Sequence, residues 1–357
     1  MQHRSTRVAA IDIARGLSVV CVVIGHVAVG LFDSGALPRD GALGVAYDVT
    51  HVFRVPAIAF VAGLFIPRAL ARHGGPRYLA DRALLLGWLY IIWTAVQTVV
   101  EVATNPIRNA PRPVDLSLLM VWTPAAQLYF LPALWLSTAV TVLLLGRRQG
   151  LAKHAGLGVA AAISLAAWGW RPPVVGIDSL GLVVFVALGA AVGLPRMSTA
   201  ARGHPAWWVA VTFAAGGLFA FAWSSGARGP LDPSTLDLLG RTAGMAAVLC
   251  GIVVTIGIAV LVASLPVVGA SLERIGRLTL PVFLAHIVFA AGARIVLQVI
   301  DVPPGIVLVV ASVVGVAGPV VLARVAPLTR LGWLFDRPRS GRTTVTTTAQ
   351  RPLTADR

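Results

Sequence analysis

The stretch DIARGLSVVCVVIGH, from Asp12 to His26, decides the fold of this chain. It is part of an apolar run long enough to span a membrane, yet it contains an Asp, an Arg and a His. At about 100° per residue, Arg15 and His26 fall within roughly 20° on one helical face, about 16 Å apart along the axis. Because charged side chains are costly inside a membrane, they mark functional positions. We therefore expect Arg15 to bind an anionic donor near the inner membrane surface and His26 to transfer protons further out.

The composition predicts an all-α, polytopic integral membrane protein. Of the 357 residues, 57% are hydrophobic and 12% are charged, whereas soluble domains have about 25% charged residues. Repeated apolar runs of about 20 residues are long enough to cross a bilayer. We predict one membrane domain over residues 8–326. The segment 327–357, which ends in a Thr-, Pro- and Arg-rich stretch, is predicted to be a disordered cytoplasmic tail.

Turn signals divide the chain into about ten apolar segments, of which the fifth is the shortest. The predicted spans are Ala9–Leu31, Tyr47–Leu70, Ala83–Thr104, Gln127–Leu145, Ala155–Trp168, Ile177–Leu194, Ala206–Trp223, Thr242–Leu265, Leu278–Ile300 and Gly305–Val325.

The distribution of arginine predicts the orientation and the location. Most arginines fall in alternate loops, on the side that also holds both termini, which the positive-inside rule assigns to the cytoplasm. We therefore expect a multi-pass protein of the inner, cytoplasmic membrane. The net charge of +15 follows from this pattern, so we do not expect nucleic acid as a partner. Membrane lipid is an expected partner, and the oligomeric state is open.

The second predicted span carries two further polar residues, His51 and Arg54, in its outer half. His51 is near enough to the interface to be an ordinary surface residue. Arg54 lies deeper and needs a partner or a polar cavity. Both are therefore candidates for a catalytic centre together with His26.

A basic segment connects the second and third predicted spans. HGGPRYLADR at 73–82 is predicted to be a cytoplasmic loop. Its arginines either anchor the orientation of the chain or bind the phosphates of a soluble donor. The candidate donor-binding residues here are Arg68, Arg72, Arg77 and Arg82.

Other polar and aromatic residues are candidates for substrate binding. His286 lies in the middle of the ninth predicted span, where bonding to a neighbouring backbone is the alternative role. Asp12 either binds substrate or pairs with Arg15 across one helical turn. Tyr129 and Trp135 fall at the start of the fourth span, where aromatics also serve as membrane-interface residues. The sequence has no zinc motif, P-loop or Rossmann glycine pattern, so we expect no metal.

In combination, these residues resemble the acyltransferase-3 family of integral membrane O-acyltransferases. The resemblance covers about residues 8–325 and rests on Arg15 and His26 in the first span, His51 and Arg54 before Pro56, YFLPALW at 129–135 and GRLTLPVFLAH at 276–286. Many relatives have Ser-Gly where this chain has Ala62-Gly63, so no hydroxyl is available there and we assign Ala62 no role.

The resemblance implies a cytoplasmic acyl-CoA donor, by default acetyl-CoA, as co-substrate. It also implies transfer of the acyl group to a hydroxyl of a sugar or glycolipid. Its first-span Arg and His correspond to Arg15 and His26, with His26 as general base, and its second-span basic residues to His51 and Arg54. The acceptor, the acyl length and an acyl-histidine intermediate stay open. Two alternatives remain: a transporter or flippase for a lipid-linked or glycosylated substrate, since intramembrane charges also line substrate paths, and an acyl carrier that serves a separate enzyme.

Overall fold

The computed structural model describes residues 6–105 and 126–338, and within these ranges the chain is helical and has no strand. The α-helices are α1 (Thr6–Asp33), α2 (Ala42–Gly63), α3 (Ile66–His73), α4 (Gly75–Thr104), α5 (Phe130–Leu145), α6 (Gly150–Ala166), α7 (Val183–Ala200), α8 (Pro205–Ser224), α9 (Leu238–Val262), α10 (Pro266–Arg277), α11 (Thr279–Val299) and α12 (Pro304–Val325). Three short 3₁₀ helices are η3 (Ala126–Tyr129), η4 (Ile177–Leu182) and η5 (Gly332–Leu334).

The predicted all-α, polytopic class is confirmed. In the described part of the chain, nine segments are helical, long and apolar enough to cross a membrane. The fifth predicted span, Ala155–Trp168, corresponds to α6, which has 17 residues. At 1.5 Å per residue α6 is about 25 Å long, shorter than the roughly 30 Å hydrocarbon core. The two termini share one side of the membrane only if α6 also crosses, so the predicted orientation remains a prediction.

The prediction of a loop at 73–82 is wrong, because these residues are helical except for Gly74. α3 ends at His73, Gly74 has a positive φ of 71°, and α4 begins at Gly75. The connection is therefore a single residue, and Arg77 and Arg82 lie on the first turns of α4. Hydropathy marks only the apolar part of a helix, so it did not predict that α4 continues into this polar segment. Pro76 in the first turn is compatible with this start, because a helix needs no N–H donor there.

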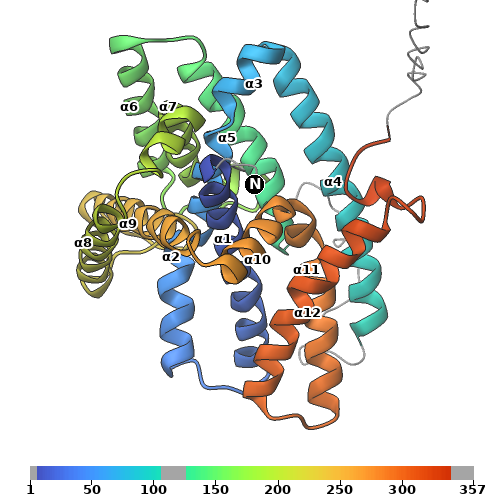
Figure 1. Ribbon diagram of the computed structural model, residues 1–357. Helices are drawn as coiled ribbons and strands as arrows, with labels where there is room; N and C mark the ends of the chain where they lie inside the picture. The colour runs from blue at the N-terminus through green and yellow to red at the C-terminus, as the bar shows by residue number, and fades with distance from the viewer. Residues whose placement is uncertain (1–5, 106–125, 339–357) are drawn as a thin grey trace, which may run out of the picture.

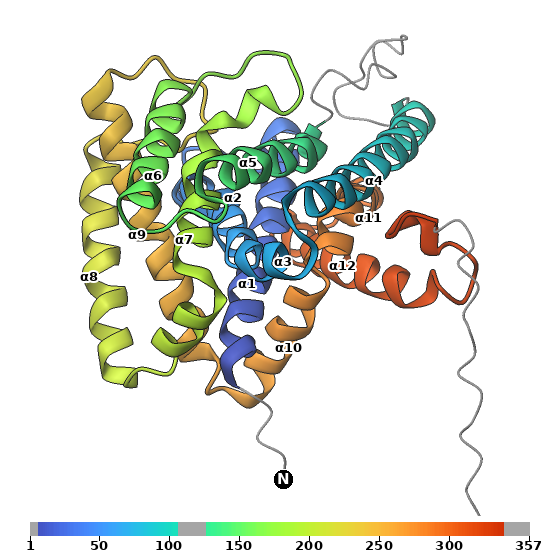
Figure 2. The same cartoon turned by 90° about the horizontal axis from the view of Figure 1, so that it is seen from above.

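α1 lies at the centre of the helical assembly. Figures 1 and 2 both show it surrounded by other helices, and it contacts α2, α7, α9, α10, α11 and α12. α8 lies at the edge and packs mainly against α9. Because α1 carries Arg15 and His26, its central position puts both residues within reach of side chains from several helices.

Two glycine contacts bring neighbouring helices close together. Gly63 of α2 and Gly189 of α7 face each other's backbone, and a Cβ at either position would overlap a carbonyl oxygen. Gly16 of α1 and Gly276 of α10 make the same kind of contact. Small residues allow such close approach in membranes, where van der Waals packing holds helices together.

The described part of the predicted tail lies against α4. The indole N–H groups of Trp88 and Trp93 donate to the carbonyl oxygens of Trp333 and Leu334, at 2.9 and 2.7 Å. The remaining residues of that prediction, 339–357, lie outside the described residues.

Candidate active site

The start of α1 is held by an acidic residue between two arginines. Asp12 is 5% exposed, and its carboxylate lies 3.4 Å from Nη1 of Arg15 and 3.5 Å from Nε of Arg277. The ion pair with Arg277 connects α1 to the end of α10, and the ion pair with Arg15 restricts the orientation of the Arg15 side chain. The predicted pair of Asp12 with Arg15 is therefore present in the structure.

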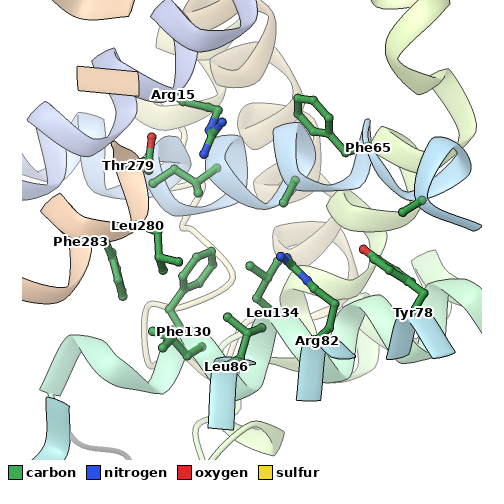
Figure 3. Close-up of a pocket in the computed structure, with 14 residues that line it drawn as sticks. Arg15, Phe65, Tyr78, Arg82, Leu86, Phe130, Leu134, Thr279, Leu280 and Phe283 are labelled. Atoms are coloured by element: carbon green, nitrogen blue, oxygen red, sulfur yellow. The ribbon is translucent and has the colours of Figure 1, made fainter. Parts of the chain in front are cut away.

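A cavity of about 330 Å³ opens next to Arg15, lined by residues of α1, α2, α3, α4, α5 and α11. Figure 3 shows Arg15 of α1 and Arg82 of α4 pointing into it from opposite sides, with Tyr78 beside Arg82. The rest of the wall is mostly apolar, and Ala62 is part of it. Its volume lies within the range of small-molecule sites. Two guanidinium groups facing one cavity favour an anionic ligand at this end.

The five predicted donor-binding arginines separate into two groups. Arg15 and Arg82 line the cavity, and Nε of Arg82 is buried with no hydrogen-bond partner in the structure. Arg68, Arg72 and Arg77 are exposed and do not line it. Arg77 instead lies 4.0 Å from Asp81, one helical turn further along α4.

The deep end of the cavity leads toward two histidines. Phe130 and Phe283 both line it, and their ring centroids are 5.4 Å apart. The ring of Phe283 lies 6.1 Å from that of His286, and His286 lies 5.2 Å from His26. A chain of aromatic contacts therefore connects the arginine-lined cavity to a pair of imidazoles contributed by α1 and α11.

His286 has one ring nitrogen satisfied and one free. Its side chain is 0% exposed. Nδ1 lies 2.8 and 3.1 Å from the carbonyl oxygens of Phe283 and Val282, which only accept, so Nδ1 carries the proton and donates. In the neutral ring, Nε2 is therefore an acceptor, and it is buried without a hydrogen-bond partner. The alternative of a histidine bonded to a nearby backbone is correct for one nitrogen only.

His51 and Arg54 form a second polar group, in which a loop residue takes part. Nη2 of Arg54 donates to Nδ1 of His51 at 2.8 Å, and Nε2 of His51 lies 2.9 Å from Oδ1 of Asp232. His51 therefore accepts from Arg54 at one nitrogen and donates to Asp232 at the other. Tyr47 completes the group, with its ring stacked on His51 and 4.9 Å from the Arg54 guanidinium.

The guanidinium of Arg54 reaches α1 beside His26. Arg54 is 4% exposed, and its Nη1 donates to the carbonyl oxygen of Cys21 at 3.4 Å. A Cβ at Gly25 would overlap this guanidinium, so the absence of a side chain there makes room for it. Arg54 is thus a buried, fixed positive charge against the α1 backbone next to His26.

The loop between α8 and α9 is held by the bundle, which places Asp232. Nε1 of Trp168 donates to the carbonyl oxygen of Arg228 at 3.1 Å, and Nη1 of Arg171 donates to that of Leu231 at 3.0 Å. The Gly229 N–H donates to Oδ2 of Asp232 at 2.9 Å. Burial alone raises the pKa of the Asp232 carboxyl, but the hydrogen bonds from His51 and Gly229 hold that pKa below its ordinary value.

The two predicted aromatic residues lie beside the cavity rather than in its wall. The Tyr129 ring faces the guanidinium of Arg171 at 4.8 Å, and Arg171 in turn pairs with buried Asp178 at 3.3 Å.

Nε1 of Trp135 donates to the carbonyl oxygen of Leu79 at 3.2 Å, and the Trp135 ring lines a separate apolar pocket of about 300 Å³ between α4 and α5. Their neighbours in YFLPALW at 129–135 reach the cavity instead, among them Phe130 and Leu134.

Two residues near the site were not predicted from the sequence, Asp232 and Gln127. Asp232 lies in a loop and precedes Pro233, so its pattern is that of an ordinary turn. Gln127 is 4% exposed, and neither its amide oxygen nor its nitrogen has a hydrogen-bond partner in the structure. The only signal for Gln127 was a polar residue at the start of a predicted span. In residues 6–105 and 126–338, no group of three or more His, Cys, Asp or Glu side chains is arranged to hold a metal.

The helical fold and its internal polar groups define a polytopic membrane protein with a ligand cavity inside the bundle. Residues 8–324 match a family model described as an acyltransferase domain. The chain therefore belongs to this acyltransferase family, and the resemblance to the acyltransferase-3 family is confirmed. Neither the search of curated proteins nor that of solved structures found a match to the chain.

Proposed function

We propose that this protein transfers an acyl group, by default acetyl, from acyl-CoA to a hydroxyl group of a sugar or glycolipid. One observation carries the proposal. A cavity has two arginines at one end, and its other end is connected by two phenylalanine rings to the His286–His26 pair. Membership of an acyltransferase family supports acyl transfer in general, and the geometry supports this donor.

The arginine end of the cavity suits the phosphates of a CoA ester. Arg15 and Arg82 supply two positive charges, and the apolar wall suits the arm that carries the thioester. The spacing of Arg15 and His26 on α1, about 16 Å along the axis, is comparable with an extended pantetheine arm. In this proposal the phosphates stay at the arginine end and the thioester carbonyl reaches the imidazoles.

The chemistry needs a base and a group that stabilises negative charge. His26 takes the proton from the acceptor hydroxyl as that oxygen attacks the thioester carbonyl. The Arg54 guanidinium, fixed next to Gly25, stabilises the oxyanion that forms. When the carbon–sulfur bond breaks, the CoA thiolate leaves and takes the proton back from the His26 imidazolium, so the imidazole is neutral again. His286 Nε2 provides an acceptor beside His26 that keeps this proton within the buried pair.

The proposed site is in the inner, cytoplasmic membrane, with the donor entering from the cytoplasm. Arg15 lies near the start of α1 and His26 about 16 Å further along, so an acceptor that meets His26 is approached from the other side or from within the membrane. Envelope polysaccharide or glycolipid fits this arrangement.

The assignment of His26 is tested by His26→Ala. Purified protein is incubated with labelled acetyl-CoA and an envelope glycan fraction, and transfer of label is measured at matched protein levels. We expect a loss of about 10²- to 10⁴-fold, the usual contribution of a general base. The control is His73→Ala, because His73 is exposed at the end of α3. Undiminished transfer by the His26 variant contradicts the base assignment.

The donor site is tested separately, by Arg82→Gln. Loss of one charged hydrogen-bonding group predicts a KM for acetyl-CoA about 10- to 100-fold higher, with a smaller effect on kcat. Arg196→Gln is the matched control, since Arg196 is exposed on α7 and outside the cavity. An unchanged KM contradicts binding of the donor phosphates at Arg82.

The alternative classes predict different products. A transporter or flippase releases no CoA from acetyl-CoA, whereas a transferase releases one CoA for each acyl group moved. An acyl carrier accumulates a covalent acyl adduct on the protein without acceptor turnover. Free thiol, protein-bound label and acylated acceptor are measured in the same reaction, so that the three classes are distinguished.

A further inference from the structure

A long apolar groove lies on the other side of α1 from the cavity. Residues of α1, α10 and α12 enclose a volume of about 690 Å³. Val20 and Ile24 of α1 contribute to it, and Ile24 lies about 180° round the helix from Arg15. The groove is therefore separate from the proposed catalytic centre.

The walls of this groove are two helices that flank α1. α10 crosses α1 in close backbone contact at Gly16 and Gly276, and α12 also packs against α1. Along α12 the groove runs from Leu308 to Arg324, about 24 Å at 1.5 Å per residue. One leaflet is about 15 Å deep, half of the roughly 30 Å hydrocarbon core. The groove is therefore long enough for a complete lipid acyl chain.

The groove is apolar along its length and basic at one end. Arg274 of α10 and Arg324 of α12 both line it and are exposed, and neither has a carboxylate partner in the described parts of the chain. Arg277, one turn after Arg274, differs because it pairs with Asp12 and Glu273. The two unpaired charges lie at the ends of α10 and α12, the end of the molecule that also carries Arg15.

A third polar group lies within the apolar wall. The hydroxyl oxygen of Ser312 is buried and has no hydrogen-bond partner in the structure, although Ser312 lines the groove. Ser312 lies about 18 Å along α12 from Arg324, so its hydroxyl faces the part of the groove farthest from the basic end.

From these observations we infer that the groove is a binding site for one anionic phospholipid. An acyl chain lies along α12 between Leu308 and Val320, and the headgroup phosphate binds Arg274 and Arg324. Basic sites between membrane helices at the cytoplasmic side recognise anionic headgroups in this way. The site does not depend on the acyl-transfer proposal, because none of its residues takes part in that chemistry.

The experiment compares two lipids on the purified protein. Native mass spectrometry measures how much phosphatidylglycerol and how much phosphatidylcholine stays bound at equal added concentrations. We expect the wild-type protein to prefer phosphatidylglycerol by about 30-fold, the effect of two basic residues near the headgroup. The double variant Arg274→Gln/Arg324→Gln loses this preference. The double variant Arg147→Gln/Arg148→Gln, which removes the same charge from exposed positions at the end of α5, keeps it.

A second variant tests the apolar part. Ala317 is exposed within the groove, and Ala317→Trp fills it without changing the charge. We expect this variant to bind less of either lipid at the groove and to keep acyl transfer from labelled acetyl-CoA. Equal retention of both lipids by the wild type, or a preference that survives in Arg274→Gln/Arg324→Gln, overturns the proposal. A dimer that Ala317→Trp abolishes also overturns it, because a second copy of the chain then occupies the groove.

Discussion

Two histidines on helices that both pack against α1 have opposite surroundings. His51 uses both ring nitrogens, one toward Arg54 and one toward Asp232. His286 uses only Nδ1, and its Nε2 is buried without a hydrogen-bond partner. The ring of His286 lies 5.2 Å from that of His26. A ring with both nitrogens occupied by charged groups holds those groups in place. A ring with a free, buried lone pair is suited to accept a proton or a hydrogen bond during a reaction.

This difference in hydrogen bonding suggests separate roles for the two polar groups inside the bundle. Asp232, His51 and Arg54 form a chain that fixes a positive charge next to Gly25. The rings of His26 and His286 lie 5.2 Å apart, and we propose that this pair holds the transferred proton. On this basis we treat His51 as a positioning residue for Arg54, which refines its predicted catalytic role into an indirect one.

Among the variants of these two polar groups, His286→Asn is expected to reduce the rate of acyl transfer most. The Asn side chain keeps an N–H donor near Nδ1 and removes the acceptor at Nε2. We expect kcat for acyl transfer from acetyl-CoA to fall by about 10²-fold and the pH–rate profile to change shape. His286→Gln is the companion variant, because its amide oxygen lies nearer to the Nε2 position and restores part of the rate. If both variants are present in the membrane at normal levels with wild-type kcat, the proposed task of Nε2 is wrong.

A smaller effect is expected from His51→Gln. This change breaks the chain between Asp232 and Arg54, so the guanidinium is less well fixed. Loss of one hydrogen bond to a charged group predicts a kcat about tenfold lower. The KM for acetyl-CoA and the pH–rate profile stay as in the wild type, because His51 does not carry the transferred proton. A shifted pH–rate profile for this variant contradicts the indirect role of His51, since it gives His51 a proton-transfer role of its own.

The smallest effect concerns stability against acid. The Asp232 pKa is lower in the folded protein than its ordinary value, so the hydrogen bonds that its carboxylate accepts from His51 and Gly229 stabilise the fold above about pH 4, the pKa of an unfolded Asp. This contribution disappears as the pH falls through the lower, folded pKa. We expect Asp232→Asn to lower the melting temperature in detergent at pH 6 and to differ less from the wild type near pH 3. Asp40→Asn, at an exposed position, serves as the control, and a difference that grows on acidification contradicts the assignment.

Much of the helical framework was accessible from the sequence. Arg15, His26, His51, Arg54 and His286 were identified because charged and titratable residues stand out in apolar runs, where each has a solvation cost. The contact between Asp232 and His51 could not be predicted in this way, because a loop acid before a proline has no unusual local pattern. That Arg82 lines the cavity and Arg77 does not could not be predicted either, since the segment that carries both was predicted to be a loop.

Most of the apolar helices, the polar residues within them and the shared face of Arg15 and His26 on α1 follow from the sequence alone. These properties follow from hydropathy and from the 3.6-residue repeat, which are local. The packing of the helices brings His286 to His26, Arg54 to Gly25, and Arg82 opposite Arg15 across the cavity, and none of these contacts follows from the sequence. The rotation and crossing of membrane helices are set by close contacts between small residues and by hydrogen bonds between polar groups of different helices. Those contacts join residues far apart in the chain.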